Sequence, residues 1–330
     1  MEKMKTVALF FGGIGNEHEI SIISAKNIFK NFPIKKYKVK LIYWAKDSHF
    51  YLVKDFNKLK TNRKRVNIEN FRKEFDIALP ITHGKYGEDG VLQGVFESQR
   101  IKYCGCRVAA SSLCMDKSLF KNLLISYKIN QVNFLLLDYF LDSKKEISSK
   151  ILKINTDFKF PIYVKPANSG SSIGVVKVEK ASQLKKAIES ALVHDSKILI
   201  EEGIVNPKEI EVSVLGNNEV FVSQPGELKL EKDFYDYDNK YKLNTAEFII
   251  PANISNEQKE EIASLSKKVY KICGCSGFSR IDFFVSKNKI YLNEVNTLPG
   301  FTSISMYAML MEASGISHRK LLEKIIELAY

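Results

Sequence analysis

The feature that most limits how this chain can fold is a run of apolar residues, Thr6–Phe11, that ends in a glycine-rich turn at residues 12–15. A continuous apolar run of strand length is typical of a parallel strand that is buried on both faces. Apolar residues at helical spacing follow between positions 20 and 28. Two further runs have strand length, Tyr37–Trp44 and Phe75–Thr82. This order predicts an α/β N-terminal part built on a parallel sheet.

A ligand site is expected where these strands end, because ligands of open α/β sheets gather at the carboxyl ends of the strands. Asn16 is a candidate N-cap for the first helix, and Glu17 and His83 lie just beyond strand ends. The glycines at positions 12, 13 and 15 do not have the spacing of a dinucleotide fingerprint, so NAD is not expected.

A second informative stretch is the hairpin predicted from Ser279–Val285 and Ile290–Val295, joined by a polar turn. Side chains alternate along a strand, so Arg280 and Asp282 share one face, and Glu294 and Asn296 share a face of the partner strand. These oxygen donors suit a hard cation such as Mg²⁺ that bridges phosphate oxygens. The alternative is a solvated polar face of an edge hairpin.

Between these two parts, the segment Phe160–Pro166 is predicted to be a strand that carries Lys165 at its end. A loop of small residues, Asn168–Gly174, follows directly and contains Ser171 and Ser172. Closely spaced backbone N–H groups and hydroxyls favour anion binding, so a flap over phosphates is expected, with Lys117 near it. An ordinary hairpin turn is the alternative.

Acidic residues dominate the next predicted strands, where Glu201 and Glu202 end one strand and Glu209 and Glu211 alternate with apolar residues on another. Such carboxylates suit the adenine amino group and ribose hydroxyls, or else a solvated edge. Glu231–Tyr241 is polar and aperiodic, which favours a lid or binding loop. Helices are expected at residues 91–99, 109–128, 181–194, 255–270 and 317–329.

Composition excludes several classes of protein. The 330 residues carry a net charge of +12, but the lysines are dispersed, and the densest run, Lys58–Arg65, is expected in a loop, so nucleic-acid binding is not predicted. The five cysteines are an odd number and are expected to be buried reduced thiols, not a zinc site. No apolar stretch is long enough to span a bilayer, so we expect a soluble cytoplasmic protein without a membrane partner.

Six motifs occur in the order found in D-alanine–D-alanine ligases of the ATP-grasp superfamily, which the chain resembles over nearly its whole length. They are GG-x-x-x-EHE-I-S at Gly12–Ser21, HG-x-x-GEDG-x-LQG at His83–Gly94, MDK at Met115–Lys117, FPIYVKPANSGSSIG at Phe160–Gly174, FYDYDNKY at Phe234–Tyr241 and SRIDFF with NEVNTLPGFTSIS at Ser279–Ser305.

The resemblance implies an ATP-dependent ligase that joins two D-alanine molecules through an acyl phosphate, for peptidoglycan precursors. It implies ATP as a substrate and two Mg²⁺ or Mn²⁺ ions. It implies an N-terminal α/β substrate-binding domain, residues 1–110, followed by ATP-grasp subdomains at 111–211 and 212–330. The family is usually dimeric, so a homodimer is expected.

The same resemblance implies a role for each candidate site residue. The catalytic set is Glu17, Ser171, Tyr241, Arg280 and Gly300, in which Glu17 holds the ammonium of the first D-alanine and Arg280 with the Gly300 N–H stabilises an oxyanion. The ATP set is Lys117, Lys165, Ser172, Glu201, Glu202, Ile204, Glu209 and Lys240. The substrate set adds His83, Ser305 and Met306 to Glu17, and the metal set is Asp282, Glu294 and Asn296.

The acceptor is the finer question within the family. Tyr241 in an intact FYDYDNKY motif argues against a D-lactate acceptor, and Met306 stands where D-serine ligases tend to have arginine. D-alanine is therefore the predicted acceptor, and D-serine is the alternative. Gly15 departs from the serine that is common in the family. Rival interpretations are another ATP-grasp carboxylate–amine ligase and a binding protein that has lost turnover.

Overall fold

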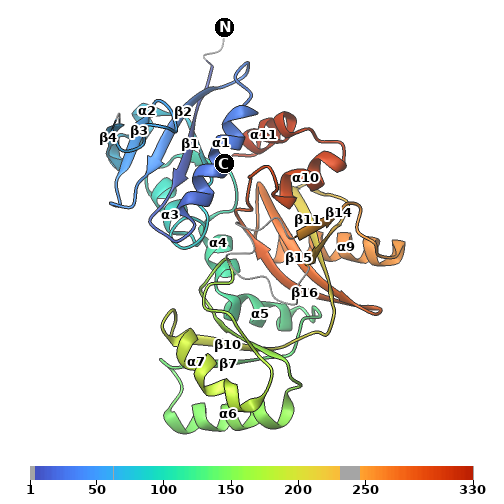
Figure 1. Ribbon diagram of the computed structural model, residues 1–330. Coiled ribbons are helices and arrows are strands. Elements are labelled where there is room, and N and C mark those ends of the chain that lie inside the picture. Colours follow the sequence, from blue (N-terminus) through green and yellow to red (C-terminus); the bar gives the residue numbers. More distant parts are fainter. Residues whose placement is uncertain (1–3, 62, 231–245, 330) are drawn as a thin grey trace.

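A computed structural model describes residues 4–61, 63–230 and 246–329, and three β-sheets organise them. The three sheets follow one another along the chain, and in Figure 1 they form a blue part, a green part and an orange-red part. The cleft described below lies where residues of all three parts meet.

The first sheet contains six strands in the order β4-β3-β2-β1-β5-β6. Strands β2, β1, β5 and β6 are parallel, and β3 and β4 extend the sheet in antiparallel fashion. The prediction of an N-terminal parallel sheet is confirmed. The strands are β1 Thr6–Gly12, β2 Lys38–Trp44, β3 Phe50–Val53, β4 Arg63–Val66, β5 Ile77–Pro80 and β6 Lys102–Tyr103, and the helices are α1 His18–Lys30, a 3₁₀ turn Ile68–Asn70, α2 Phe71–Glu74 and α3 Val91–Ser98.

Both faces of β1 are covered, as its apolar run requires. Val7, Leu9 and Phe11 are fully buried on one face, and Phe10 is fully buried on the other. Phe10 makes edge-to-face contacts with four phenylalanine rings, at centroid distances between 5.0 and 5.9 Å. The first face packs into a core that also includes the C-terminal helices α10 Met306–Ala313 and α11 His318–Glu327. The last part of the chain therefore returns to the first sheet.

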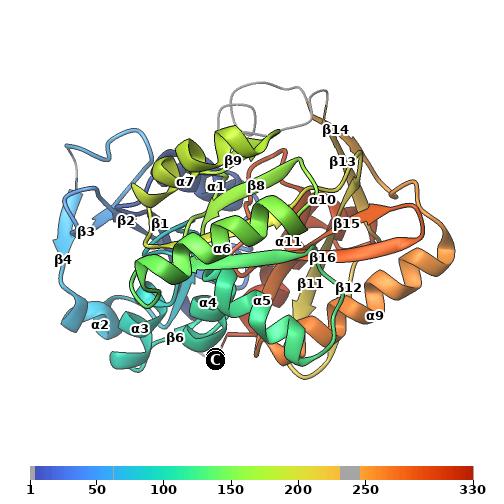
Figure 2. The ribbon, with the colours of Figure 1, turned by 90° about the horizontal axis from the view of Figure 1, so that it is seen from below.

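The second sheet is antiparallel, in the order β7-β10-β8-β9, and has its own core. Its elements are β7 Phe134–Asp138, α6 Lys144–Asp157, β8 Ile162–Pro166, β9 Val176–Val178, a 3₁₀ turn Ala181–Gln183, α7 Leu184–Leu192 and β10 Lys197–Glu202. Two helices connect it to the first sheet, α4 Val108–Met115 and α5 Lys117–Ser126. Figure 2, seen from below, shows α6 lying across this sheet.

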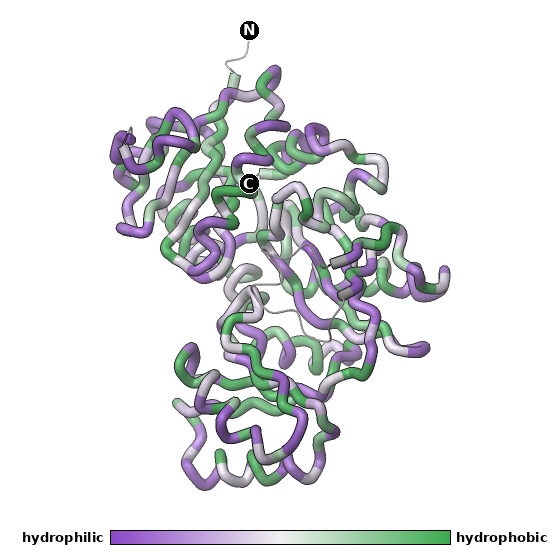
Figure 3. Tube along the Cα trace, in the orientation of Figure 1, coloured by the Kyte–Doolittle hydropathy of each residue, from purple (hydrophilic) through white to green (hydrophobic). Residues whose placement is uncertain are grey.

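The third sheet is also antiparallel, in the order β14-β13-β11-β15-β16, with β12 paired to β11. Its elements are β11 Lys208–Gly216, β12 Val220–Val222, β13 Gly226–Leu230, β14 Ala246–Ile249, α9 Asn256–Ile272, β15 Phe278–Ser286 and β16 Lys289–Asn296. The predicted hairpin is β15 and β16. Figure 3 shows hydrophobic segments gathered along the inner strands and hydrophilic segments on the outer helices and loops.

Three local predictions are wrong. The predicted helix 109–128 is two helices, because Asp116 is extended and its side chain accepts hydrogen bonds from the N–H groups of Ser118 and Leu119, which caps α5. The first helix has Glu17 as its N-cap, not Asn16. The basic run that was expected in a loop contributes Arg63–Val66 to the edge strand β4, where charged side chains oppose pairing with another sheet.

Two predictions from composition can be compared with the structure. All five cysteines are buried and free, as expected. None of the helices that the structure describes combines the length and the apolar character that crossing a membrane requires. The domain division at residues 110 and 211 stays a prediction, and its second boundary lies within β11, so a division at the connection 203–207 would keep the third sheet whole.

Candidate active site

A cleft of about 700 Å³ contains every predicted site residue that the structure describes. Strand ends of the first sheet, the serine loop and β10 of the second sheet, and the hairpin of the third sheet all contribute to it. The predicted residues that line it are Glu17, His83, Lys117, Lys165, Ser171, Ser172, Glu201, Glu202, Ile204, Glu209, Arg280, Asp282, Glu294, Asn296, Gly300, Ser305 and Met306. Lys240 and Tyr241, and the rest of the loop 231–245, lie outside the described residues.

At one end of the cleft, Glu17 and Ser171 are in direct contact although they are far apart in the sequence. The Ser171 hydroxyl donates a hydrogen bond to Glu17 Oε1. Gly84, at a φ of +73°, makes room for the same carboxylate, because a Cβ there would lie 2.1 Å from Glu17 Oε2. This end therefore presents a buried carboxylate, which suits a ligand ammonium group.

His83 is a fixed part of this end. Its Nδ1 lies 3.0 Å from the Leu298 carbonyl oxygen, and its Nε2 lies 3.0 Å from Ser24 Oγ. Burial lowers the pKa of His83, so the neutral imidazole is favoured, with Nδ1 donating to the carbonyl and Nε2 accepting from the hydroxyl. The imidazole thus joins α1 to the segment that leads to Gly300.

Elsewhere along the cleft, the hairpin presents the predicted polar face. In the ladder, Arg280 is opposite Asn296 and Asp282 is opposite Glu294, and a bulge follows directly after that pair. Arg280 donates to both oxygens of Asp282, from Nε and Nη2 at 2.7 Å each, and its Nε is 3.0 Å from Glu211 Oε2. The apolar residues on the opposite face of β15 are buried in a core, so this face is rigidly supported.

The donor set at this face fits Mg²⁺. Asp282, Glu294 and Asn296 offer two carboxylates and an amide oxygen, and Asn296 Nδ2 already donates to Asp282 at 3.0 Å. No group of three or more His, Cys, Asp or Glu in the described ranges is arranged to hold a metal ion. The set has only two carboxylates, which is the usual number where substrate phosphates complete the coordination of Mg²⁺.

Two lysines also line the cleft. Lys117 Nζ donates to the Ser169 carbonyl at 2.5 Å, and Lys165 Nζ lies 2.5 Å from Glu201 Oε2. Ser171 and Ser172 have φ values of +50° and +58°, a conformation that non-glycine residues rarely adopt. Strained backbone of this kind is often found at ligand-binding loops.

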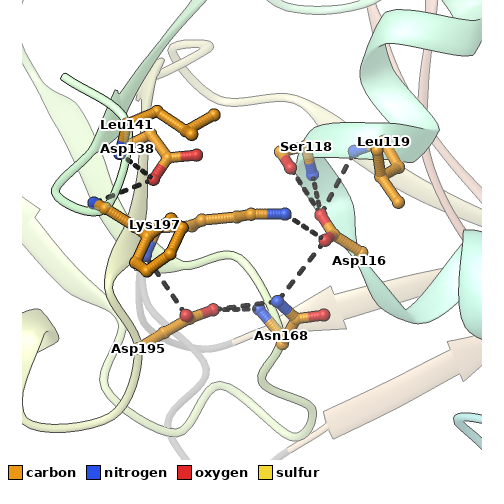
Figure 4. A network of polar contacts seen from close by, with 9 residues as sticks. Asp116, Ser118, Leu119, Asp138, Leu141, Asn168, Asp195 and Lys197 are labelled. Atoms are coloured by element: carbon orange, nitrogen blue, oxygen red, sulfur yellow. Dashed lines mark hydrogen bonds and ion pairs between the residues drawn. The ribbon is translucent and has the colours of Figure 1, made fainter.

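The base of the serine loop is held by a polar network (Figure 4). Asp116 accepts hydrogen bonds from Ser118 and lies 2.9 Å from Lys197 Nζ. Asn168 donates from its backbone N–H and its side chain to Asp195, at 2.8 and 3.1 Å. Burial raises the pKa of Asp116, but the Ser118 and Lys197 contacts outweigh it and keep that pKa low. The network therefore fixes the loop to the helix that carries Lys117.

Ser305 and Met306 begin α10 at the border of the cleft. Ser305 Oγ accepts a hydrogen bond from the Thr302 N–H at 2.9 Å, and a Cβ on Gly300 would lie 2.8 Å from that oxygen. Met306 is buried. The turn around Gly300 is thus packed closely against the start of this helix.

Two residues that sequence reasoning left without a role belong to this region. Glu88 lines the cleft, and burial together with the charges of Glu17 and Glu294 raises its pKa well above the ordinary value. Its signal was the GEDG part of the second motif. Lys121 lies one helical turn after Lys117 and pairs with Glu201 at 2.8 Å. No pattern distinguished it from the many surface lysines.

Comparison with known proteins agrees with this geometry. Residues 6–106 match the model of the D-ala D-ala ligase N-terminus, and residues 123–327 match that of the D-ala D-ala ligase C-terminus. The chain belongs to the D-alanine–D-alanine ligase family. It is 44% identical to the D-alanine–D-alanine ligase of Caldicellulosiruptor bescii, over 100% of this chain and 96% of that protein, and 42% identical to D-alanine–D-alanine ligase B of Clostridium tetani, over 100% and 94%.

Solved structures of this ligase family have the same fold. A D-Ala:D-Ser ligase from Enterococcus faecalis superposes with a TM-score of 0.88, at 33% identity over 99% of both chains. The D-alanine–D-alanine ligase of Coxiella burnetii gives 0.82, at 29% identity over 99% of this chain and 94% of that one. The predicted ATP-grasp architecture and the assignment to the ligase class are therefore confirmed.

Proposed function

We propose that the chain joins two D-alanine molecules into D-alanyl-D-alanine and converts one ATP to ADP and phosphate, supplying peptidoglycan precursors. The observation that carries this proposal is one cleft that is lined both by a buried carboxylate, Glu17, and by the Arg280–Asp282 face. An amino acid bound by its ammonium at Glu17 would direct its carboxylate toward that face.

The reaction proceeds through two successive nucleophilic displacements. One carboxylate oxygen of the first D-alanine attacks the γ-phosphorus of ATP, and ADP leaves. The amine of the second D-alanine then attacks the acyl carbon, and phosphate leaves with that carboxylate oxygen while the amine loses a proton. Glu17, hydrogen-bonded to Ser171, holds the first ammonium, and Arg280 with the Gly300 N–H stabilises the oxyanion. Tyr241 is predicted to join Ser171 and Glu17.

The nucleotide is assigned to the region between the serine loop and β10. Lys117, Lys165 and Ser172 are assigned to the phosphates, with Lys240, and Glu201, Glu202, Ile204 and Glu209 to adenosine. Asp282, Glu294 and Asn296 would hold two Mg²⁺ or Mn²⁺ ions. Metal bound there would neutralise charge on the β- and γ-phosphates. The second D-alanine is assigned to the side formed by His83, Ser305 and Met306.

A second candidate function is ligation of D-alanine to D-serine. The high structural similarity to a D-Ala:D-Ser ligase favours keeping it, whereas buried Met306 at the assigned acceptor side offers no charged partner to a serine hydroxyl. A homodimer and a cytoplasmic location remain predictions from family resemblance and from composition.

Phosphate release from the purified chain tests this function. With ATP, Mg²⁺ and D-alanine the chain should release phosphate, and L-alanine should not replace D-alanine. Adding D-serine at equal concentration should leave D-alanyl-D-alanine as the main product. Release that is greater with D-serine than with D-alanine alone would favour the second candidate, and no release with either would contradict both.

A further inference from the structure

Lys121, to which the proposed function gives no role, lies behind the nucleotide region of the cleft. It projects from α5, and its side chain is only 2% exposed. Its Nζ is 2.8 Å from Glu201 Oε1, while Lys165 Nζ is 2.5 Å from Oε2 of the same carboxylate. The described residues that line the cleft include Glu201 and Lys165 but not Lys121. One buried carboxylate therefore holds one lysine on the cleft side and one on the interior side.

Burying the charged ammonium of Lys121 costs free energy, which favours a functional role for this lysine. Burial lowers the pKa of Lys121, and only the Glu201 carboxylate acts strongly in the opposite direction. Its ammonium also has a long polar contact of 3.5 Å to Gln131 Oε1, and the centroid of the Phe134 ring lies 5.3 Å away. Lys165 alone would neutralise Glu201 in this state. A second buried cation is needed only when Lys165 moves away from the carboxylate.

We propose that Lys121 is a positioning residue, the permanent counter-ion of Glu201 that frees Lys165 to bind a nucleotide phosphate. The inference rests on the proposed function, since it takes Lys165 as a phosphate ligand. With Lys121 in place, Glu201 stays ionised when Lys165 turns to the phosphate. Without Lys121, that movement would leave a buried carboxylate with no cation, and Glu201 would take up a proton as nucleotide binds.

Charged and titratable groups on α5, β8 and β16 surround the Glu201 carboxylate. Lys121 and Lys117 face the site from α5, Lys165 and Tyr163 from β8, and Glu294 acts on Lys165 from β16. Of these, Lys121 and Lys165 make the ion pairs to Glu201. Together they hold the Glu201 pKa at about 2, against the effect of burial.

The test uses Lys121→Met, which keeps most of the apolar stem and removes the charge. Binding of ADP with Mg²⁺ to the full chain is measured by calorimetry from about pH 6 to about pH 8, with proton uptake obtained from buffers of different ionisation enthalpy. Wild type at each pH is the reference, which cancels titration of the nucleotide itself. Lys121→Met/Glu201→Gln and Glu201→Gln alone complete a double-mutant cycle.

We expect Lys121→Met to bind ADP about tenfold or more weakly at neutral pH, with added proton uptake and an affinity that falls as pH rises by up to about tenfold per unit. In the Glu201→Gln background, loss of Lys121 should have little effect on that affinity. A Lys121→Met chain with wild-type affinity, or with a loss that is equal at every pH, would overturn the inference.

Two further results are informative if Lys121→Met does not fold or if wild type does not bind ADP. If Lys121→Met does not fold, wild type still decides, because proton uptake at Glu201 in wild type, detected as uptake that Glu201→Gln abolishes, would contradict a permanent counter-ion. If wild type itself does not bind ADP, the proposed function fails and the inference fails with it, whereas ADP binding that Lys121→Met leaves unchanged overturns the inference alone. Arginine at position 121 should restore a pH-independent affinity if the larger side chain is accommodated.

Discussion

Replacing Arg280 by methionine tests the most specific role assigned to the hairpin. The change removes two donors at 2.7 Å from Asp282 and a contact of 3.0 Å to Glu211. If Arg280 stabilises the oxyanion, kcat should fall by roughly a hundredfold to a thousandfold, equivalent to about 3–4 kcal/mol of transition-state stabilisation. Phosphate release at saturating ATP, Mg²⁺ and D-alanine measures this loss.

The alternative is that Arg280 only neutralises the acids around it. Removing it leaves two nearly buried carboxylates, Glu211 and Asp282, without their cation, which in isolation costs about 3–5 kcal/mol of folding free energy. Added Mg²⁺ would offset that cost, so a neutralising arginine would be replaceable. Arg280→Lys is the matched control, because it keeps the charge and loses the forked geometry. Near-normal kcat for Arg280→Met at saturating Mg²⁺, with the fold intact, would refute the catalytic role.

Two more outcomes follow from contacts in the cleft. Ser171→Ala removes the hydroxyl that donates to Glu17, so the KM for the first D-alanine should rise by about tenfold. Ser169→Ala, in the same loop, is the control and should raise this KM less. Equal effects of the two changes on KM would contradict the assignment. Glu201 has a pKa lowered from 4.5 to about 2 because Lys121 and Lys165 outweigh burial, so its stabilisation is present above pH 4.5 and is lost as pH falls toward about 2. The free energy of unfolding of wild type minus that of Glu201→Gln, from denaturant titrations, should therefore shrink over that range, and a constant difference would be evidence against the ion pairs.

Sequence patterns were sufficient to predict an element where a single local rule determines its structure. The apolar run of Thr6–Phe11 identified a strand covered on both faces. Alternation predicted that Glu294 and Asn296 share a face of the hairpin, and the ladder pairs them with Asp282 and Arg280. The break at Asp116 was missed because helical spacing continues on both sides of it, although aspartate before Ser118 is a capping signal. The short strands β3 and β4 carry weak patterns, and sheet pairing stabilises them.

The candidate site likewise has residues that the sequence predicted and residues whose role only tertiary packing reveals. The co-location of Glu17, Ser171 and Arg280 in one cleft was expected from family resemblance, since no periodicity relates positions so far apart in the chain. Lys121 was not expected, because its importance comes from burial beside Glu201, and burial of a lysine is decided by tertiary packing. The return of α10 and α11 to the first sheet is likewise a tertiary contact without a local signal.

The central claim is that a carboxylate of D-alanine is phosphorylated by ATP in this cleft, and an isotope transfer tests it most directly. Purified chain is given ATP, Mg²⁺ and D-alanine whose carboxylate oxygens carry a heavy isotope, and the released phosphate is analysed by mass spectrometry. The account predicts one labelled oxygen in each phosphate and the other retained in the dipeptide. Phosphate that carries no label while dipeptide forms would contradict it.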